Sequence, residues 1–395
     1  MTQSARDLVM SLKIAQAVNA SGGRAFYVGG YVRDEILGRR GKDIDIEIHG
    51  ITEERLTEIL GTLGEVLTMG ASFGILGLRH YTIDIILPRS LITGEVDPFI
   101  GTREAARRRD FTMNALMKDI LTGEVIDHFV GVRDIREKVI RHVDDNTFLL
   151  DPLRVIRAAR FAAVLGFTID DYTKQWCSSA DTSSLAHERV FAELENVLLK
   201  SPEPSRFFWE LESMEQGRSF FPSLLTVHRF DTDIIDRAVK FRESASYKIG
   251  FMLTLLCRFM SKNDAASFLS RLTNDIRLTK YVLNMSKLAN ILAGMPEDLP
   301  EISFLRVFDA AESPEDLSVM SDLISGFSRA DMLELYRERM AMPYVTGADI
   351  LREGVSSGPE VGGALRHIHD LRLSGAAKDV QLREAIKYIR GENNG

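Results

Sequence analysis

The fold of the N-terminal region is decided by the stretch Asp43-Ile44-Asp45-Ile46-Glu47-Ile48, in which acidic residues and isoleucine alternate. Successive side chains of a β-strand point to opposite faces, so the isoleucines face a core and the acids share the other face. The stretch therefore predicts a half-buried strand that presents carboxylates on one side.

Carboxylates held in register on a strand are suited to bind divalent metal ions, and Asp43 and Asp45 are the candidates here. A pair of such ions lies roughly 3.5–4 Å apart and stabilises the attacking and leaving oxygens of a phosphoryl transfer. Asp84 lies between Ile83 and Ile85 and repeats the pattern, so it could supply a third carboxylate. The alternative for all of them is a solvated acidic strand face.

A glycine-rich turn precedes the acidic strand in the run Gly29-Gly30-Tyr31-Val32-Arg33-Asp34, which follows a predicted strand over 25–29 and opens a predicted helix over 30–37. Paired glycines let the backbone approach a ligand closely. Arg33, one turn into the helix, can add a bidentate contact to a phosphate group. A Gly-Gly turn alone can be only a turn, but here it lies close in sequence to the two aspartates. Together they predict a phosphate-binding loop beside a metal site.

Composition restricts the classes of protein. The chain has 395 residues, 45% hydrophobic and 27% charged, which is typical of a globular protein of several domains. Its two cysteines, Cys177 and Cys257, predict a reducing compartment, and the first residues lack the features of a signal peptide, so we expect a cytoplasmic location. The most apolar run, 249–257, is too short to cross a membrane.

The net charge of −8 is unevenly distributed, and the distribution permits a nucleic-acid partner. Residues 101–160 contain 12 Lys and Arg against 10 Asp and Glu, which is +2, so the remainder of the chain carries −10. Strand and helix patterns alternate as far as Pro88, and from about Arg103 the pattern is helical almost to the last residue. This predicts an α/β domain followed by an all-α remainder.

The segment from Asp151 to Gly166 predicts a helix that carries arginines at spacings of three, Arg154, Arg157 and Arg160. At about 100° per residue they cover an arc of roughly 120°, and apolar residues are interleaved with them. A solvated basic face would not be so interleaved. The arginines therefore either line a cleft or form buried ion pairs.

Five motifs in a fixed order give the chain a specific resemblance. They are Gly29-Gly30-Tyr31-Val32-Arg33-Asp34, Asp43-Ile44-Asp45, Arg108-Arg109-Asp110-Phe111-Thr112-Met113-Asn114-Ala115-Leu116, Asp151-Pro152-Leu153-Arg154-Val155-Ile156-Arg157-Ala158-Ala159-Arg160-Phe161 and Glu188-Arg189-Val190. The sequence resembles the class II tRNA nucleotidyltransferases, which share a head domain with bacterial poly(A) polymerases and belong to the DNA polymerase beta superfamily. The stretch 343–349 is similar to the tail of this family.

The resemblance implies an elongated multi-domain protein. A nucleotidyltransferase head, an α/β domain with a small mixed sheet, would span residues 1–118. A helical, nucleotide-selecting neck would span 119–200, and a helical, tRNA-binding body and tail would span 201–395. The head would transfer nucleotides from CTP and ATP to the 3′ end of a tRNA and release pyrophosphate, while the C-terminal half holds the tRNA elbow.

The resemblance also implies roles for single residues. Asp43 and Asp45 would bind Mg²⁺, while Asp84 is a candidate for a third catalytic carboxylate on its strand pattern alone. Asp151 and Arg154 would select the base, because cytosine and adenine each present an amine beside an unprotonated ring nitrogen, whereas guanine and uracil present a carbonyl and an N–H. The remaining residues expected to bind the nucleotide are Gly29, Gly30, Arg33, Arg109, Arg157 and Arg160.

Of two departures from the family, the first leaves the product open and the second concerns how the base-selecting pair is held. The segment from Pro88 to Arg107 is short and lacks the basic, glycine-rich stretch of relatives that finish the CCA end, and Leu150 stands where many relatives have glutamate. Addition of CCA, of CC alone or of A alone therefore remain alternatives. A bacterial poly(A) polymerase and a non-catalytic RNA-binding protein are the further alternatives.

Overall fold

The computed structural model describes residues 2–39, 44–69, 75–90, 93–217, 221 and 232–392. The chain divides into two compact units. The first consists of Met1–Val197 and Arg206–Phe220, and the second of Leu198–Ser205 and Phe221–Gly395.

A mixed β-sheet forms the centre of the first unit. Within the described residues it has seven strands in the order β3-β4-β5-β2-β1-β6-β7. The bounds are β1 (Arg24–Val28), β2 (Ile44–His49), β3 (Val66–Met69), β4 (Ile75–Leu78), β5 (Ile83–Ile86), β6 (Met117–Asp119) and β7 (Val125–Ile126). Only the β2–β5 pair is parallel among the strand pairs of this sheet that the structure describes.

Strand β2 is the alternating stretch that the sequence singled out. The side chains of Ile44, Ile46 and Ile48 are buried, as the alternation predicts. On the other face, Asp45 is half-buried and lies directly opposite Asp84 of the parallel strand β5. The two carboxylates therefore belong to adjacent strands at the same level of the sheet.

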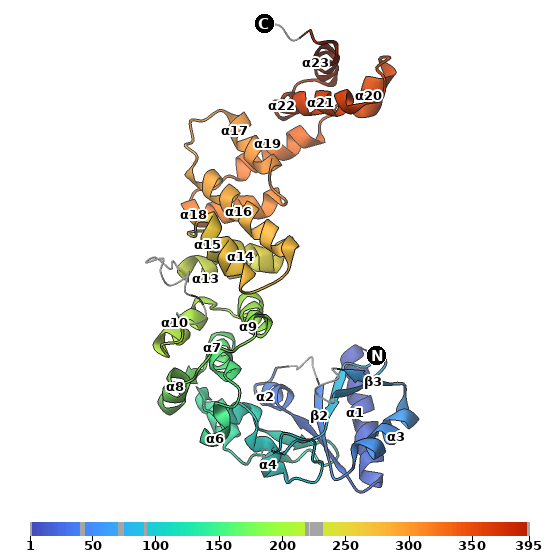
Figure 1. Ribbon diagram of the computed structural model, residues 1–395, viewed down its shortest axis with the longest axis vertical. Coiled ribbons are helices and arrows are strands. Elements are labelled where there is room, and N and C mark those ends of the chain that lie inside the picture. The colour runs from blue at the N-terminus through green and yellow to red at the C-terminus, as the bar shows by residue number, and fades with distance from the viewer. Residues whose placement is uncertain are drawn as a thin grey trace. The chain divides into compact units, whose positions relative to one another are not determined.

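Helices surround the sheet and continue from it. Helices α1 and α3 pack against each other and against the sheet (Figure 1). Thr52 begins α3, because its hydroxyl accepts a hydrogen bond from the Arg55 amide. The helices of this unit are α1 (Gln3–Ala20), α2 (Gly30–Ile36), α3 (Glu53–Leu63), α4 (Thr102–Arg107), η1 (Thr112–Asn114), α5 (Gly131–Glu137), α6 (Asp145–Phe148), α7 (Leu153–Leu165), α8 (Asp171–Ser178), α9 (His187–Lys200) and α10 (Ser205–Ser213).

The predicted fold class, an α/β head with a small mixed sheet followed by helices, is confirmed. The expectation of helices alone after Arg103 was wrong for four short strands: β6, β7, β8 (Val139–Ile140) and β9 (Thr168–Ile169). Strand β6 pairs with β1 and extends the head sheet, and β8 pairs with β9. Runs of two or three residues are too short to show a period of two, and these strands exist because distant partners hydrogen-bond to them.

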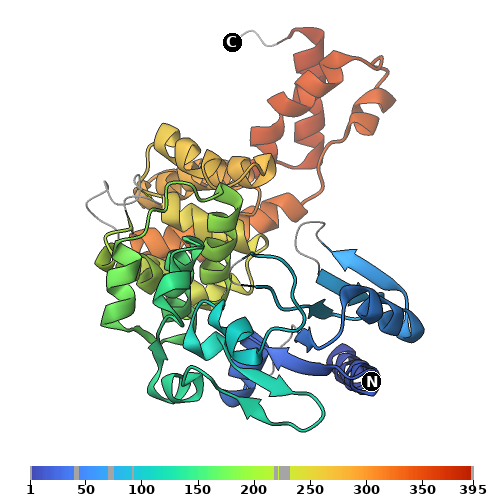
Figure 2. The same cartoon turned by 60° about the horizontal axis from the view of Figure 1, so that its bottom comes forward.

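The second unit is helical throughout its described residues. Its helices are α13 (Thr232–Arg242), α14 (Lys248–Cys257), α15 (Lys262–Ser270), α16 (Ile276–Gly294), α17 (Glu301–Asp309), α18 (Pro314–Ser325), α19 (Ala330–Ala341), α20 (Gly347–Arg352), α21 (Pro359–His367), α22 (His369–Leu373) and α23 (Lys378–Arg390). The last four form the red group in Figure 2, around a core that includes Ile350, Ala364 and Ile368. Among the described helices, none has the length and apolar character needed to cross a membrane.

Candidate active site

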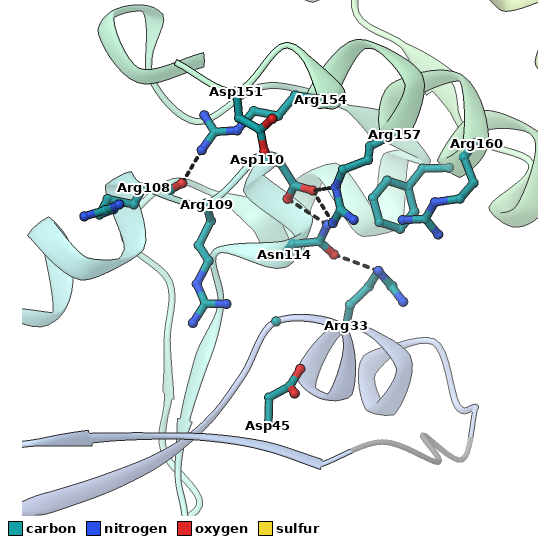
Figure 3. A pocket seen from close by; sticks show the side chains of 13 residues that line it. Arg33, Asp45, Arg108, Arg109, Asp110, Asn114, Asp151, Arg154, Arg157 and Arg160 are labelled. Carbon is teal, nitrogen blue, oxygen red and sulfur yellow. Dashed lines mark hydrogen bonds and ion pairs between the residues drawn. The ribbon is translucent and has the colours of Figure 1, made fainter. Parts of the chain in front are cut away.

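A polar cavity of about 550 Å³ lies in the first unit, between the glycine turn, strand β2 and helix α7 (Figure 3). It collects most of the residues that the sequence analysis singled out. The predicted residues that line it are Gly29, Gly30, Arg33, Asp45, Arg109, Asp151, Arg154, Arg157 and Arg160, and they are joined by Arg108, Asp110, Asn114 and Phe161. The interleaved arginines of α7 therefore line a cleft, and two of them, Arg157 and Arg160, also form ion pairs.

Gly29 has a backbone conformation that favours glycine, with φ of +65°. A Cβ atom built on it would lie 3.6 Å from an Nη atom of Arg109 and 3.8 Å from an Oδ atom of Asp45. These distances are ordinary van der Waals contacts, so a side chain would not clash here. Glycine is favoured because any other residue would be strained at this positive φ. The turn brings main chain, carboxylate and guanidinium close together at one end of the cavity.

The carboxylates expected to bind metal are only partly described. Asp43 lies outside the described residues, Asp45 lines the cavity, and Asp84 does not line it although it lies next to Asp45 in the sheet. In the described part of the chain, no three His, Cys, Asp or Glu side chains gather as a metal site. The oxygen donors of Asp45 and Asp84 are nevertheless the ligands that Mg²⁺ prefers. Asp45 thus offers a divalent ion one carboxylate at this end of the cavity, with Asp84 beside it on β5.

Glu47 shares the face of Asp45 but has a different environment. It is buried, and its carboxylate accepts hydrogen bonds from Arg109 at 2.7 Å and from the His49 ring at 2.9 Å. Burial acts to raise the pKa of Glu47, but Arg109 and His49 outweigh burial and hold the pKa below its usual range. Glu47 thereby fixes the position of Arg109 at the edge of the cavity.

Arg33 is held from two sides. Its Nε donates to Asp34 at 2.8 Å, and one of its Nη atoms donates to the Asn114 side-chain oxygen at 2.7 Å. The guanidinium lies close to Gly30, since a Cβ atom built there would be 3.4 Å from an Nη atom of Arg33. A cationic group is therefore fixed beside the glycine turn.

Asp110 is a buried anion that contacts helix α7 through Arg157. Its carboxylate accepts from Asn114 at 2.9 Å and from two nitrogens of Arg157 at 2.8 and 2.6 Å. Burial acts to raise the pKa of Asp110, but Arg157 and the hydrogen bonds from Asn114 and the Phe111 amide hold the pKa below its usual range. Asp110 is thus an ionised partner for the middle arginine of α7.

Helix α9 supplies the second anion. Glu193 is buried, accepts from Arg157 at 3.2 Å and forms an ion pair with Arg160. Burial acts to lower the pKa of Arg157, but Asp110 and Glu193 outweigh burial and raise it. Arg160, for which burial is the largest influence, has a lowered pKa. These two half-buried arginines are therefore paired, as charge that is largely withdrawn from water requires.

Asp151 and Arg154, the predicted base-selecting residues, lie at the beginning of α7 and both line the cavity. The Arg154 guanidinium donates to the carbonyl oxygens of Thr147, at 2.8 Å, and Arg108. Burial lowers the pKa of Arg154. The Asp151 carboxylate accepts two bonds from one nitrogen of Arg189, at 2.9 and 3.2 Å. Neither side chain depends on the other for its orientation.

Phe161 provides an aromatic surface among these cations. The guanidinium carbon of Arg160 lies 3.8 Å from the ring centroid, that of Arg33 5.2 Å and that of Arg157 5.4 Å. Guanidinium groups favour the face of an aromatic ring. The ring therefore lies between the arginine of the head and the arginines of α7.

The segment that carries Asp110 and Asn114 is supported from behind by helix α5. Thr112 donates its hydroxyl proton to the fully buried Asp134 at 2.7 Å. Gly131, at the start of α5, lies so close that an added Cβ atom would be 2.2 Å from the Thr112 carbonyl oxygen. Neither Gly131 nor Asp134 lines the cavity, yet both determine where its wall lies.

Sequence reasoning did not assign roles to several residues of this site. Asp110, Asn114 and Phe161 stand inside quoted motifs, so their proximity to predicted residues was the available signal. Arg189 also stands in a quoted motif, but its partner Asp151 is 38 positions away. For Glu193 the signal was its position four residues after Arg189, which places both on one side of a helix.

Comparisons with known proteins agree with this architecture. Residues 25–141 match the family described as Poly A polymerase head domain. A Multifunctional CCA protein of Xanthomonas campestris pv. campestris is 34% identical over 217 residues, which make up 51% of this chain and 51% of that protein. The matched region thus spans about half the length of that relative.

Two further proteins are similar over nearly the whole chain. The CCA-adding enzyme of Lactococcus lactis subsp. cremoris is 27% identical over 399 residues, 95% of this chain and 94% of that protein. The Bacillus stearothermophilus CCA-adding enzyme, solved in complex with CTP, has a TM-score of 0.75 at 23% identity and covers 99% of both chains. Residues 25–141 thus match the Poly A polymerase head domain family, and the chain as a whole has the fold of a solved CCA-adding enzyme.

Proposed function

We propose that the protein is a template-independent nucleotidyltransferase that adds C and A residues to the 3′ end of tRNA. The observation that carries this proposal is the cavity in which the glycine turn and the Asp45 carboxylate meet Asp151 and Arg154 at the start of α7. The matched CCA proteins and the CTP-bound structure support the choice of reaction, nucleotide and RNA.

In the reaction, the 3′ hydroxyl oxygen of the tRNA attacks the α-phosphorus of CTP or ATP. A new phosphodiester bond forms, the bond between the α-phosphorus and the bridging oxygen breaks, and pyrophosphate leaves with the electron pair while the hydroxyl loses its proton. Chemistry of this kind depends mainly on positioning and on stabilisation of charge. Both are supplied in the cavity by fixed cations and carboxylates.

The triphosphate would lie along the glycine turn. Gly29 and Gly30 leave room for the phosphate groups, Arg33 meets them from α2, and Arg109 meets them from the segment after α4. Each guanidinium is already oriented by its own acidic partner. Donors that are fixed in advance need little reorganisation when charge develops.

Asp43 and Asp45 would bind Mg²⁺, with Asp84 as a neighbouring carboxylate on β5. When bound there, a pair of divalent ions would lower the pKa of the attacking hydroxyl and stabilise the leaving pyrophosphate. The protein's own contribution is to hold the Asp45 carboxylate on a rigid central strand, next to the glycine turn.

The base would be selected by Asp151 and Arg154. The carboxylate accepts from the exocyclic amine of cytosine or adenine, and the guanidinium donates to the adjacent ring nitrogen. Guanine and uracil would leave both charged groups facing the wrong partner. Arg157 and Arg160 support this pair from the next turns of α7 and face the phosphate end of the cavity.

The roles of the three parts of the chain are proposed from the family resemblance. We assign residues 1–118 to the catalytic head, 119–200 to a nucleotide-selecting neck, and 201–395 to a body and tail that hold the tRNA elbow. We place the activity in the cytoplasm, in keeping with two free, buried cysteines.

The test is incorporation of labelled CTP and ATP into tRNA that lacks its terminal CCA. Addition of two C residues and one A is expected, and incorporation of neither nucleotide would refute the proposal. The same assay separates the alternatives, because an enzyme that adds CC or A alone stops at a shorter product. The second candidate is a poly(A) polymerase, because the matched family is described as Poly A polymerase head domain. Such an enzyme would make long tracts from ATP and would not incorporate CTP.

A further inference from the structure

Asn114 lies between the two halves of the cavity and touches both. Its side-chain oxygen accepts from Arg33 at 2.7 Å, and its side-chain nitrogen donates to Asp110 at 2.9 Å. Asp110 in turn accepts two bonds from Arg157 of helix α7. Figure 3 shows this continuous series of contacts from the glycine turn to α7.

The amide group is suited to this position because its oxygen can accept one hydrogen bond while its nitrogen donates another. A carboxylate there would accept from Arg33 but would place a second anion beside Asp110, and an aliphatic side chain would offer neither bond. Asn114 is only 5% exposed, so water does not readily replace a lost partner. The contacts on either side are therefore energetically dependent on it.

We propose that Asn114 is a positioning residue that couples triphosphate binding at Arg33 to base selection on helix α7, through Asp110 and Arg157. This inference rests on the proposed function, since it concerns the same nucleotide site. A phosphate group that accepts hydrogen bonds from Arg33 competes with Asn114 for the same donors. The bond between Arg33 and Asn114 then weakens, and Asn114 shifts its contact with Asp110, which holds Arg157. Such coupling is reciprocal, so a correct base also strengthens binding of the triphosphate.

The chain offers a matched pair of arginines for the test. Both Arg33 and Arg109 line the phosphate end of the cavity, but Arg33 is bonded to Asn114 whereas Arg109 is bonded to Glu47. Equilibrium binding of inorganic triphosphate, CTP and UTP is measured for the wild-type protein and for Arg33→Ala, Arg109→Ala, Asn114→Ala and the double variant Arg33→Ala/Asn114→Ala.

Both arginine variants should bind inorganic triphosphate about tenfold more weakly, as expected for a lost charge-assisted contact. Only Arg33→Ala should also lower the ratio of CTP to UTP affinity, by about fivefold. Asn114→Ala should lower that ratio by a similar factor, and the double variant should lower it no further. This non-additivity is the signature of transmission through Asn114.

An Arg33→Ala protein whose CTP-to-UTP ratio stays within about twofold of wild type would overturn the coupling, as would an equal loss of the ratio in Arg109→Ala. Melting temperatures are recorded for every variant. Asn114→Asp is measured in addition to Asn114→Ala, and Asn19→Asp, at an exposed position, is its control. Asn114→Asp keeps the shape of the side chain and should lower the ratio even where Asn114→Ala does not fold. A wild-type protein that binds CTP but does not incorporate it would refute the proposed function and leave the coupling intact.

Discussion

The phosphate end and the base end of the cavity are constructed in different ways. At the phosphate end, the glycine turn and Arg33 lie within a few residues of each other, and Asp45 follows on a strand that pairs with the one before the turn. At the base end, Asp151 is held by Arg189 and Arg157 by Asp110, contacts that join positions 38 and 47 residues apart. The glycine turn, Arg33 and Asp45 therefore follow from neighbouring sequence, and only Arg109 joins them through a long-range ion pair, with Glu47. The base end depends on long-range ion pairs for both Asp151 and Arg157.

The largest expected effect comes from the carboxylate of the phosphate end. Asp45→Ala removes an expected metal ligand, so we expect nucleotide incorporation to fall by about 10²- to 10³-fold or more, with the CTP-to-UTP ratio of any residual activity unchanged. Single-turnover incorporation measures the loss, and Glu58→Gln on the exposed side of α3 is the control. A variant with unchanged turnover would mean that this strand does not take part in the chemistry.

At the base end, Arg154→Ala should relax base choice while phosphate binding is retained. Discrimination against UTP should fall by about ten- to a hundredfold, which corresponds to about 1–3 kcal/mol for one base-specific contact. The affinity for inorganic triphosphate should change by less than about twofold, because the phosphate contacts remain. Unaltered preference for C over U would contradict the assignment of α7 as the selecting element.

Arg189→Ala tests whether the base end depends on support from α9. The pair with Asp151 is partly exposed, with 51% of the arginine and 37% of the aspartate side chain accessible, so it is worth about 0.2–1 kcal/mol. We expect a loss of base discrimination of about two- to fivefold. Lys200→Ala, which removes a cation from the end of the same helix, should have no such effect. Equal losses in both variants would point to a general electrostatic cause.

The smallest expected effect concerns acid stability. The pKa of Asp110 is held below its usual range, so its pairing stabilises the folded protein above the ordinary carboxyl pKa and is lost as the pH falls through the lowered value. Urea denaturation should show that the free energy of unfolding decreases more steeply below about pH 5 in the wild-type protein than in Asp110→Asn, by up to about one proton. Parallel slopes would show that Asp110 does not titrate with unfolding.

The same contrast explains what could be predicted from the sequence. Strand β2, the glycine turn and the arginine spacing of α7 were recognisable because alternation, glycine pairs and helical periodicity are local patterns. The pairing of the arginines with Asp110 and Glu193 was not recognisable, because the two acids become neighbours of α7 only through the tertiary fold. The three-residue strand β6 was missed for the same reason, since its pairing with β1 is what makes it a strand.

The geometry of the site also depends on Gly131, a residue that does not line the cavity. Any side chain at this position would collide with the Thr112 carbonyl oxygen and push the segment bearing Asp110 and Asn114. Genetic screens for loss of activity should therefore recover substitutions of Gly131 together with those of the cavity residues. Natural variants at this remote glycine deserve the same scrutiny as variants of the arginines themselves.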